Sequence, residues 1–340
     1  MVSVDGWDEL TGDAGPMTTP AWHRAWAETL GKPYRLRVLT ATDDGKLRGV
    51  LPLVQRRGRP WRLEAMGARE LGEPVDASWN DADGVRLLAE RLIALRRPVA
   101  LHRVLAESPL VEALTAAGRG RAVVNVRTAV GAPRLALDES WLEPERHFNS
   151  GRRSDLRRAR RRAEAYGEVE FTEFSPVPGE VGGLLDDFVA VEGAGWKGRG
   201  GTALATDEGA ERFYRRFGEL AAEAGELRLT FLRLGGRLAA AELAVERAGR
   251  SWLLKIGYDE TFARCSPGTL LMLHTVRAAA HRGLRSVEFL GSEAPWTRTW
   301  TTEVRPCVNV RCFAGGWAPA AAAEDLSRYG VHRLRAAARP

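Results

Sequence analysis

The sequence is poor in cysteine and has no long apolar run, and each scarcity excludes a class of protein. Cys265, Cys307 and Cys312 are its only cysteines. An odd number of thiols does not suit a disulfide framework, and their spacing matches no zinc motif, so we expect reduced thiols and no metal. No run approaches the roughly 18 apolar residues of a membrane-spanning helix. The first residues lack the basic start and apolar core of a secretory signal, so we expect a cytoplasmic protein with no membrane partner.

Lysine is scarce as well, although the chain is basic. The 340 residues include four lysines and 46 arginines. This preference, together with abundant alanine and glycine, is typical of a GC-rich genome, so an arginine here need not have been selected for its forked geometry. The formal net charge of +6 nevertheless favours anionic partners such as nucleotides, CoA or RNA.

The overall composition is that of a globular protein, and the sequence shows both helix and strand patterns. The chain is 44% hydrophobic and 28% charged, and its length suggests about two domains. We place the boundary between residues 145 and 146. The first half alternates between helix and strand patterns. Its expected elements are helices at 20–30, 83–96 and 108–117 and strands at 34–40, 47–54, 99–104 and 123–126.

A strongly basic segment follows this boundary. It contains seven arginines from Arg152 to Arg162, while Leu156, Ala159 and Ala163 recur at helical spacing. We therefore expect a cationic helix with a thin apolar stripe. Two interpretations remain open: a solvated connecting helix, or a helix that contacts the phosphates of a substrate or an RNA.

The second half has the clearer order of elements. Three strands joined by two-residue turns are expected to form a meander, followed by a helix that is apolar nearly all round and therefore buried. The expected strands are 227–234, 238–246, 251–259, 286–290 and 303–313, and the buried helix is 270–280.

The second turn of the meander predicts a register. If Arg247 faces Arg250, Glu242 lies directly opposite Lys255, and both charged residues belong to otherwise apolar strands. One interpretation is a cross-strand ion pair. The other is a functional site, because an ion pair in an apolar setting shifts pKa values, as functional sites also do.

Several short motifs occur in a fixed order between about residues 19 and 300. They are Thr-Pro-Ala-Trp at 19–22 with Trp26, Gly-Val-Leu-Pro-Leu at 49–53, the basic run at 152–160, Glu-Gly-Ala-Gly-Trp-Lys-Gly at 192–198, Phe-Tyr at 213–214, Gly-Tyr-Asp at 257–259, Ser-Pro-Gly at 266–268 and Glu-Phe-Leu-Gly at 288–291. Together with the element order, they resemble the GNAT acyltransferases of the CelD-like (cellulose-biosynthesis-type) group. The architecture is shared with the Fem-type aminoacyltransferases.

This resemblance implies an α/β (α+β) fold with two GNAT-like mixed-sheet halves packed side by side. Residues 1–145 would form a degenerate GNAT-like domain, and residues 146–340 would form the acyltransferase domain that begins with the basic helix. The sequence departs from the family at two motifs. The Tyr-Lys-x-x-Trp pattern is replaced by the stretch from Trp296 to Trp300, which has Arg298 but no lysine. The pyrophosphate loop keeps Arg264 and Gly268 at altered spacing.

The implied reaction is N-acyl transfer from acetyl-CoA or another acyl-CoA to an amine by direct attack. The acceptor would be a small molecule, a saccharide or a peptide. A helix N-terminus offers N–H donors and a positive dipole end to the CoA pyrophosphate. The candidate cofactor-binding residues are therefore Arg264, Ser266, Pro267, Gly268 and Thr269. The alternative for this segment is an ordinary helix start.

The acceptor amine must lose a proton, so carboxylates are the candidate catalytic groups. They are Glu242 with its expected partner Lys255, Asp259 and Glu192. Structural alternatives are a turn cap for Asp259 and plain solvent exposure for Glu192. The candidate substrate-binding residues are Trp196, Lys197, Trp296, Arg298 and Trp300, and packing is the alternative for the tryptophans.

Two other functions remain open from the sequence. A Fem-like aminoacyltransferase would take its donor from aminoacyl-tRNA, and the basic helix from Arg152 to Arg162 would bind that tRNA. A binding module without catalysis would explain the degenerate pyrophosphate loop and the missing lysine.

Overall fold

The computed structural model describes residues 4–195 and 204–337, with side chains described as far as residue 327. It divides into two compact units, which we call unit 1 and unit 2. Unit 1 comprises Met1–Gly12, Met17–Gly131 and Arg305–Pro340, and unit 2 comprises Asp13–Pro16 and Ala132–Val304. This grouping differs from the expected boundary, because the C-terminal segment packs with the N-terminal part of the chain.

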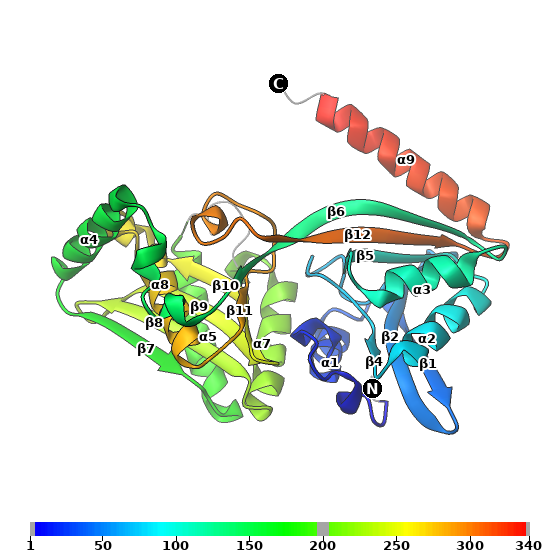
Figure 1. The fold of residues 1–340 in the computed structure, drawn as a ribbon, viewed down its shortest axis with the longest axis horizontal. Coiled ribbons are helices and arrows are strands. Elements are labelled where there is room, and N and C mark those ends of the chain that lie inside the picture. Colours follow the sequence, from blue (N-terminus) through cyan, green and yellow to red (C-terminus); the bar gives the residue numbers. More distant parts are fainter. Residues whose placement is uncertain (1–3, 196–203, 338–340) are drawn as a thin grey trace. The chain divides into compact units, whose positions relative to one another are not determined.

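Unit 1 is a mixed sheet with helices packed on it (Figure 1). Its strand order is β1-β2-β3-β5-β12-β6, and β4 pairs with β2. The strands are β1 (Tyr34–Asp43), β2 (Lys46–Arg56), β3 (Leu63–Ala65), β4 (Ser78–Trp79), β5 (Val99–Leu105), the first part of β6 (Val123–Ala136) and β12 (Val304–Phe313). The helices are α1 (Pro20–Thr29), α2 (Ala82–Ala94), α3 (Pro109–Gly118) and α9 (Ala318–Ala337). Leu88 and Leu92 of α2 pack with Leu51 and Leu53 of β2 in the core.

Unit 2 holds the expected meander and buried helix. Its strand order is β6-β11-β10-β9-β8-β7, with β10 and β11 parallel and the other pairs antiparallel. The strands are β7 (Val169–Phe174), β8 (Leu227–Leu234), β9 (Arg237–Arg247), β10 (Arg250–Tyr258), β11 (Ser286–Glu288) and the end of β6. The helices are α4 (Ser150–Glu164), α5 (Pro178–Gly193), α7 (Glu208–Glu223) and α8 (Pro267–His281). Short 3₁₀ helices lie at Asp8–Leu10, Pro16–Thr18, Glu139–Leu142, Pro144–His147, Leu204–Thr206, Glu260–Cys265 and Thr297–Thr299.

The two turns of the meander form as their residues predict. Gly235 and Gly236 join β8 to β9, and Ala248 and Gly249 join β9 to β10, all with positive φ angles between 52° and 77°. Such angles at both central residues match the right-handed twist of the strands. Helices cover both faces of this meander, because α8 packs against β8, β9 and β10 while α5 packs against β9 and β10. On β10, Ile256 faces the α8 residues and the next residue, Gly257, faces Glu192 of α5.

The predicted pairing of Glu242 with Lys255 is wrong. Arg247 does face Arg250, but the register shifts by one residue between Leu253 and Lys255, so Glu242 lies opposite Ile256. A β-bulge of this kind adds one residue to one strand and moves the following side chains to the other face. Glu242 therefore faces α8, while the ammonium of Lys255 lies 4.9 Å from the ring centre of Tyr214 on α7.

The basic helix is confirmed as α4. The side chain of Asn149 caps it by accepting a hydrogen bond from the N–H of Arg152 at 2.8 Å. Leu156, Ala159 and Ala163 form the expected buried stripe, which packs toward α8 and the 3₁₀ helix at Glu260–Cys265.

Cys265, Cys307 and Cys312 are buried and are not joined in disulfide bonds. No helix in the described part of the chain is long and apolar enough to cross a membrane. The described residues also contain no group of three or more His, Cys, Asp and Glu side chains that could hold a metal ion.

Candidate active site

A cavity of about 500 Å³ lies in unit 2, beside the end of β10. The pairing between β10 and β11 stops at Trp252 and Glu288, so the rest of β10 is no longer covered by β11 on that edge. The cavity is lined by this part of β10, the start of α8, residues of the loop at 295–300, and one charged residue each from α4 and α5. Its volume falls in the range of small-molecule sites, roughly 300–1,000 Å³.

The start of α8 borders the cavity through Ser266, Gly268 and Thr269. Ser266 has a left-handed backbone conformation with φ 49°, and Pro267 follows it at the first helical position. The N–H groups of Thr269 and Leu270 donate to the carbonyl oxygen of Ser266 at 3.0 and 3.2 Å. The helix start thus presents hydroxyl groups and the positive end of its dipole to the cavity.

The other two candidate cofactor residues lie outside the lining. Pro267 has no N–H to donate. The carbonyl oxygen of Arg264 accepts a hydrogen bond from Nη1 of Arg162 at 3.1 Å. The degenerate loop therefore brings its serine, glycine and threonine to the cavity, but not its arginine.

Glu192 is the only carboxylate among the described residues that line the cavity. It ends α5, is 1% exposed, and its Oε2 accepts a hydrogen bond from the N–H of Leu204 at 2.9 Å. Solvent exposure was the structural alternative for this residue, and that interpretation is wrong. The burial arises because α5 packs directly on β10, where a Cβ atom at Gly257 would lie 2.7 Å from the Cα of Glu192.

The other candidate catalytic residues do not line the cavity. Glu242 is 2% exposed and accepts a hydrogen bond from the Thr275 hydroxyl at 2.8 Å, within the core beneath α8. Burial raises its pKa to about 7. Asp259 caps the 3₁₀ helix that follows β10, where its carboxylate accepts from the N–H of Thr261 at 2.8 Å.

Of the candidate substrate-binding residues, the two described tryptophans line the cavity and Arg298 does not. Trp296 and Trp300 both line the cavity, with Trp296 partly exposed and Trp300 buried. Trp300 also makes an edge contact with Phe148 at 5.6 Å between ring centres. Arg298 is exposed and forms an ion pair with Glu293 at 2.7 Å. Trp196 and Lys197 lie outside the described residues.

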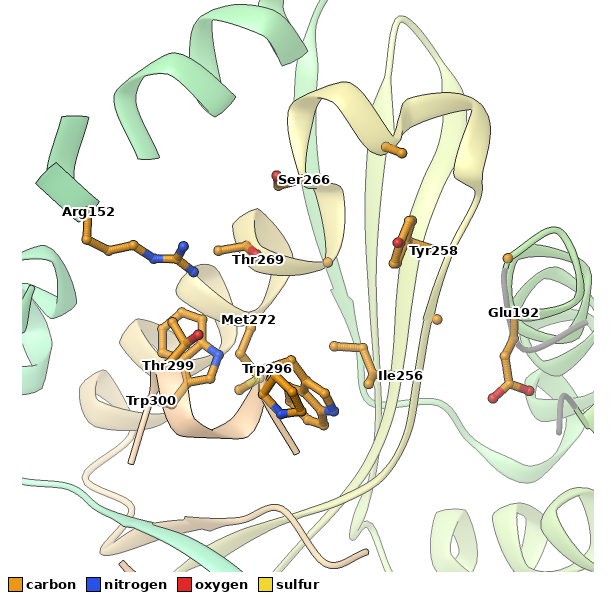
Figure 2. Close-up of a pocket in the computed structure, with 15 residues that line it drawn as sticks. Arg152, Glu192, Ile256, Tyr258, Ser266, Thr269, Met272, Trp296, Thr299 and Trp300 are labelled. Carbon is orange, nitrogen blue, oxygen red and sulfur yellow. The ribbon is translucent and has the colours of Figure 1, made fainter. Parts of the chain in front are cut away.

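The sequence named Arg152 only as one arginine of the basic helix, and the structure places this one in the lining of the cavity. Figure 2 shows its side chain extending from α4 into the cavity, in the direction of Thr269. A signal was present, because Arg152 precedes Leu156, Ala159 and Ala163 by 4, 7 and 11 positions and so shares the face of their buried stripe. Tyr258, Ile256, Met272 and Thr299 also line the cavity.

Comparison with known proteins identifies the domain type. Residues 150–298, which lie within unit 2, match the family model of the acetyltransferase (GNAT) domain. A search of curated proteins found no match.

Solved structures share the fold over most of the chain. FemX superposes with a TM-score of 0.58 at 11% identity, covering 92% of this chain and 96% of its own. The C-terminal domain (DUF2156) of a candidate lysylphosphatidylglycerol synthetase from Agrobacterium fabrum has a TM-score of 0.56 at 12% identity, with 87% and 90% covered. L-PGS from Bacillus licheniformis has a TM-score of 0.53 at 11% identity, with 87% and 92% covered.

At such low identities these structures show the fold alone, and they support the expected α/β class with two sheet-bearing units. The match of residues 150–298 adds the domain type, which agrees with the meander, the buried helix and the cavity beside them. The chain therefore contains a GNAT-type acetyltransferase domain at residues 150–298.

Proposed function

We propose that this protein transfers an acyl group, acetyl in the simplest case, from an acyl-CoA to an amine. The proposal includes the finer resemblance to the CelD-like group, with a small molecule, a saccharide or a peptide as acceptor. The observation that carries it is the cavity itself, whose lining combines the start of α8 with the buried acidic residue Glu192.

The chemistry needs a proton acceptor next to the attacking amine. The amine nitrogen forms a bond to the thioester carbonyl carbon, the C–S bond breaks, and the amine proton passes to the carboxylate of Glu192. The leaving thiolate needs a proton in turn. Tyr258 lines the same cavity and carries a hydroxyl that can donate one.

The hydrophobic residues of the lining can pack against the pantetheine chain of the acyl-CoA. Ile256, Met272, Trp296 and Trp300 offer apolar surface between the polar groups of the cavity. Such walls exclude water from the thioester, and water would otherwise compete with the amine as nucleophile.

Aminoacyl transfer from tRNA is the second candidate, and the fold shared with FemX favours it. Its expected tRNA-binding surface is α4, yet several arginines of this helix already have partners. Arg158 pairs with Asp155, and Arg160 pairs with Glu164. Exposed ion pairs of this kind reduce the net positive field that a phosphate backbone would meet.

Binding tests separate the two donors. Thermal unfolding would be followed with acetyl-CoA, free CoA and bulk tRNA added separately. A ligand at 100 times its dissociation constant adds about 2.7 kcal/mol to stability, which moves the melting midpoint by a few degrees. Stabilisation by the CoA species is expected. Stabilisation by tRNA alone would replace the acyl-CoA proposal with aminoacyl transfer.

The Glu192→Gln substitution tests the catalytic step. Glutamine keeps an oxygen that can accept from the N–H of Leu204, but it cannot take up the amine proton. Thiol release from acetyl-CoA with a panel of amines should fall about 100-fold or more, while acetyl-CoA affinity stays close to that of wild type. Glu223→Gln, at an exposed position near the end of α7, is the matched control. Full activity of Glu192→Gln would rule out Glu192 as the proton acceptor.

A further inference from the structure

The cavity carries one positive and one negative side chain among its described lining residues. The positive one is Arg152 and the negative one is Glu192. Figure 2 shows them on opposite sides of the lining residues, with Ile256, Met272 and Trp296 between them. The two sides of the cavity therefore suit opposite charges, and apolar surface separates them.

Arg152 is distinguished from other arginines of α4 by its surroundings. Its Nε atom is buried and has no hydrogen-bond partner among the described residues. By contrast, Arg158 and Arg160 pair with carboxylates of their own helix, and Arg162 donates to the carbonyl oxygen of Arg264. A buried guanidinium nitrogen without an acceptor is costly, so the position is suited to an anion that arrives with a ligand.

Hydroxyl-bearing residues also line the cavity, and Figure 2 shows Thr269 and Thr299 on the same side as Arg152. Ser266 and Thr269 come from the start of α8, and Thr299 comes from the loop after β11. The positive end of the α8 dipole adds to the charge of the guanidinium. A phosphate, with several acceptor oxygens, matches a forked guanidinium and convergent hydroxyl donors.

The cation of this wall comes from α4 rather than from the loop before α8. Arg264 is not among the lining residues, and the sequence of its loop is degenerate. Arg152 reaches the same helix start from a different element, because it lies one turn before Leu156 on the buried stripe of α4. Arg152 on α4 therefore supplies the positive charge of the cavity, which Arg264 in the loop before α8 does not.

We infer that Arg152 binds the phosphate of a phosphopantetheine thioester. This inference rests on the proposed function and adds the residue that recognises the donor. The phosphate would lie against Arg152 and the hydroxyls of α8, the arm would follow the apolar surface, and the thioester would reach the side of Glu192. The same phosphate occurs at the pantetheine end of CoA and on an acyl carrier protein.

The test is the affinity of four donors for wild type, Arg152→Gln and Arg152→Lys, measured by calorimetry. The probes are acetyl-CoA, acetyl-3′-dephospho-CoA, S-acetyl-4′-phosphopantetheine and S-acetylpantetheine, of which the last has no phosphate. Arg152→Gln should weaken the three phosphate-bearing probes by about 10- to 100-fold, as expected for a charge-assisted hydrogen bond, and leave S-acetylpantetheine unchanged. The affinity of Arg152→Lys for these three probes should lie between those of wild type and Arg152→Gln. An ammonium keeps the positive charge but lacks the two parallel N–H donors of a guanidinium.

Arg157→Gln is the matched control, since this arginine is exposed on the same helix and does not line the cavity. It should bind all four probes as wild type does. Unliganded melting midpoints of the Arg152 and Arg157 variants identify any loss of folding. If Arg152→Gln weakens S-acetylpantetheine as much as acetyl-CoA, or weakens neither, the inference fails.

The outcomes also distinguish a failure of this inference from a failure of the proposed acyl-transfer function. If wild type binds acetyl-CoA and Arg152→Gln binds it equally well, the inference is overturned and the proposed function stands. If wild type binds none of the four probes, the proposed function is overturned and takes the inference with it. Transfer from an acetylated acyl carrier protein but not from acetyl-CoA would replace acyl-CoA by the carrier as donor, and loss of that transfer in Arg152→Gln but not in Arg157→Gln would support the phosphate contact.

Discussion

The carboxyl group of Glu242 is buried in the core of unit 2, away from the cavity. It is 2% exposed and accepts a hydrogen bond from the hydroxyl of Thr275. Burial raises its pKa to about 7; the carboxylates of Glu173 and Glu246 add to the rise, while Thr275 and Arg282 oppose it. A protonated carboxyl group here packs under α8 as a neutral residue, so we assign it to stability rather than to proton transfer.

The Glu242→Gln variant should therefore change how stability depends on pH. A glutamate in the unfolded chain ionises near its ordinary pKa of 4.5, whereas the buried group keeps its proton to about pH 7. Between these values the folded state binds more protons, so the free energy of unfolding falls as the pH rises, and the fall ends above the folded pKa. Glutamine does not ionise, so the variant should gain about 3 kcal/mol relative to wild type across this window.

Denaturant unfolding of both proteins at about pH 5 and about pH 8 measures this difference. Comparison with wild type cancels other groups that titrate in the window, such as Asp76, whose burial raises its pKa to about 7. Glu223→Gln, an exposed glutamate, should show the same difference from wild type at both pH values. A pH-independent difference for Glu242→Gln would mean that Glu242 does not have a raised pKa in the folded protein.

At the residue scale, the sequence identified some residues that line the cavity and misjudged the surroundings of others. Ser266 and Gly268 could be predicted because their Ser-Pro-Gly motif resembles that of a known family, and both line the cavity. Solvent exposure is the ordinary state of a glutamate at a helix end, and this alternative for Glu192 is wrong. Its burial depends on how closely α5 approaches β10, and no local pattern encodes that distance.

At the scale of elements, the contact between α5 and β10 is one that only glycine permits. A Cβ atom at Gly257 would lie 2.7 to 2.9 Å from the Cα, Cβ and Cγ atoms of Glu192. Gly195 is similarly close to the carbonyl oxygen of Tyr258, at 2.6 Å from an added Cβ atom. Glu192 thus belongs to the cavity lining because two glycines let the end of α5 rest on the strand.

The Gly257→Ala variant should disturb both stability and catalysis. The added methyl group must push α5 away from β10, at a cost of about 1 to 3 kcal/mol, and it moves Glu192 with the helix. Under the proposed mechanism, thiol release should fall while acetyl-CoA affinity changes less. Gly183→Ala is the control, because Gly183 is exposed on α5 with nothing within 4 Å of an added Cβ atom. Gly183→Ala should stabilise the protein by about 0.5 to 1 kcal/mol. Equal effects of Gly257→Ala and Gly183→Ala on stability would mean that the contact at Gly257 does not require glycine.

The elements were largely predictable from the sequence, whereas their exact pairing was not. Gly235, Gly236 and Gly249 marked the meander turns, and the apolar pattern of α8 indicated a buried helix. The bulge after Leu253 has no such marker. A leucine within an apolar strand looks the same whether it is paired or bulged, so the predicted partner of Glu242 was one residue off.

At the scale of the whole molecule, unit 1 is completed by the last part of the chain. β12 pairs with β5. Glu324 and Asp325 of α9 form ion pairs with Arg59 and Arg62, which precede β3. Arg62 is almost fully buried, and it donates to Asp325 and to the carbonyl oxygen of Ala321 at 2.7 Å each. A domain boundary drawn from local composition misses this closure, because it depends on pairing between residues about 200 positions apart.

The Asp325→Ala variant tests whether the two units are separate cooperative units. It leaves the buried guanidinium of Arg62 with fewer acceptors, which should cost about 2 kcal/mol. Hydrogen exchange followed by mass spectrometry should then speed up in β3, β5 and β12 of unit 1, while β8, β9 and β10 keep their protection. Glu90→Ala, which breaks an exposed ion pair with Arg86, is the control and should cost at most about 0.5 kcal/mol. Because the contacts of Arg62 lie within unit 1, an equal rise of exchange in β8, β9 and β10 would mean instead that the two units unfold as one.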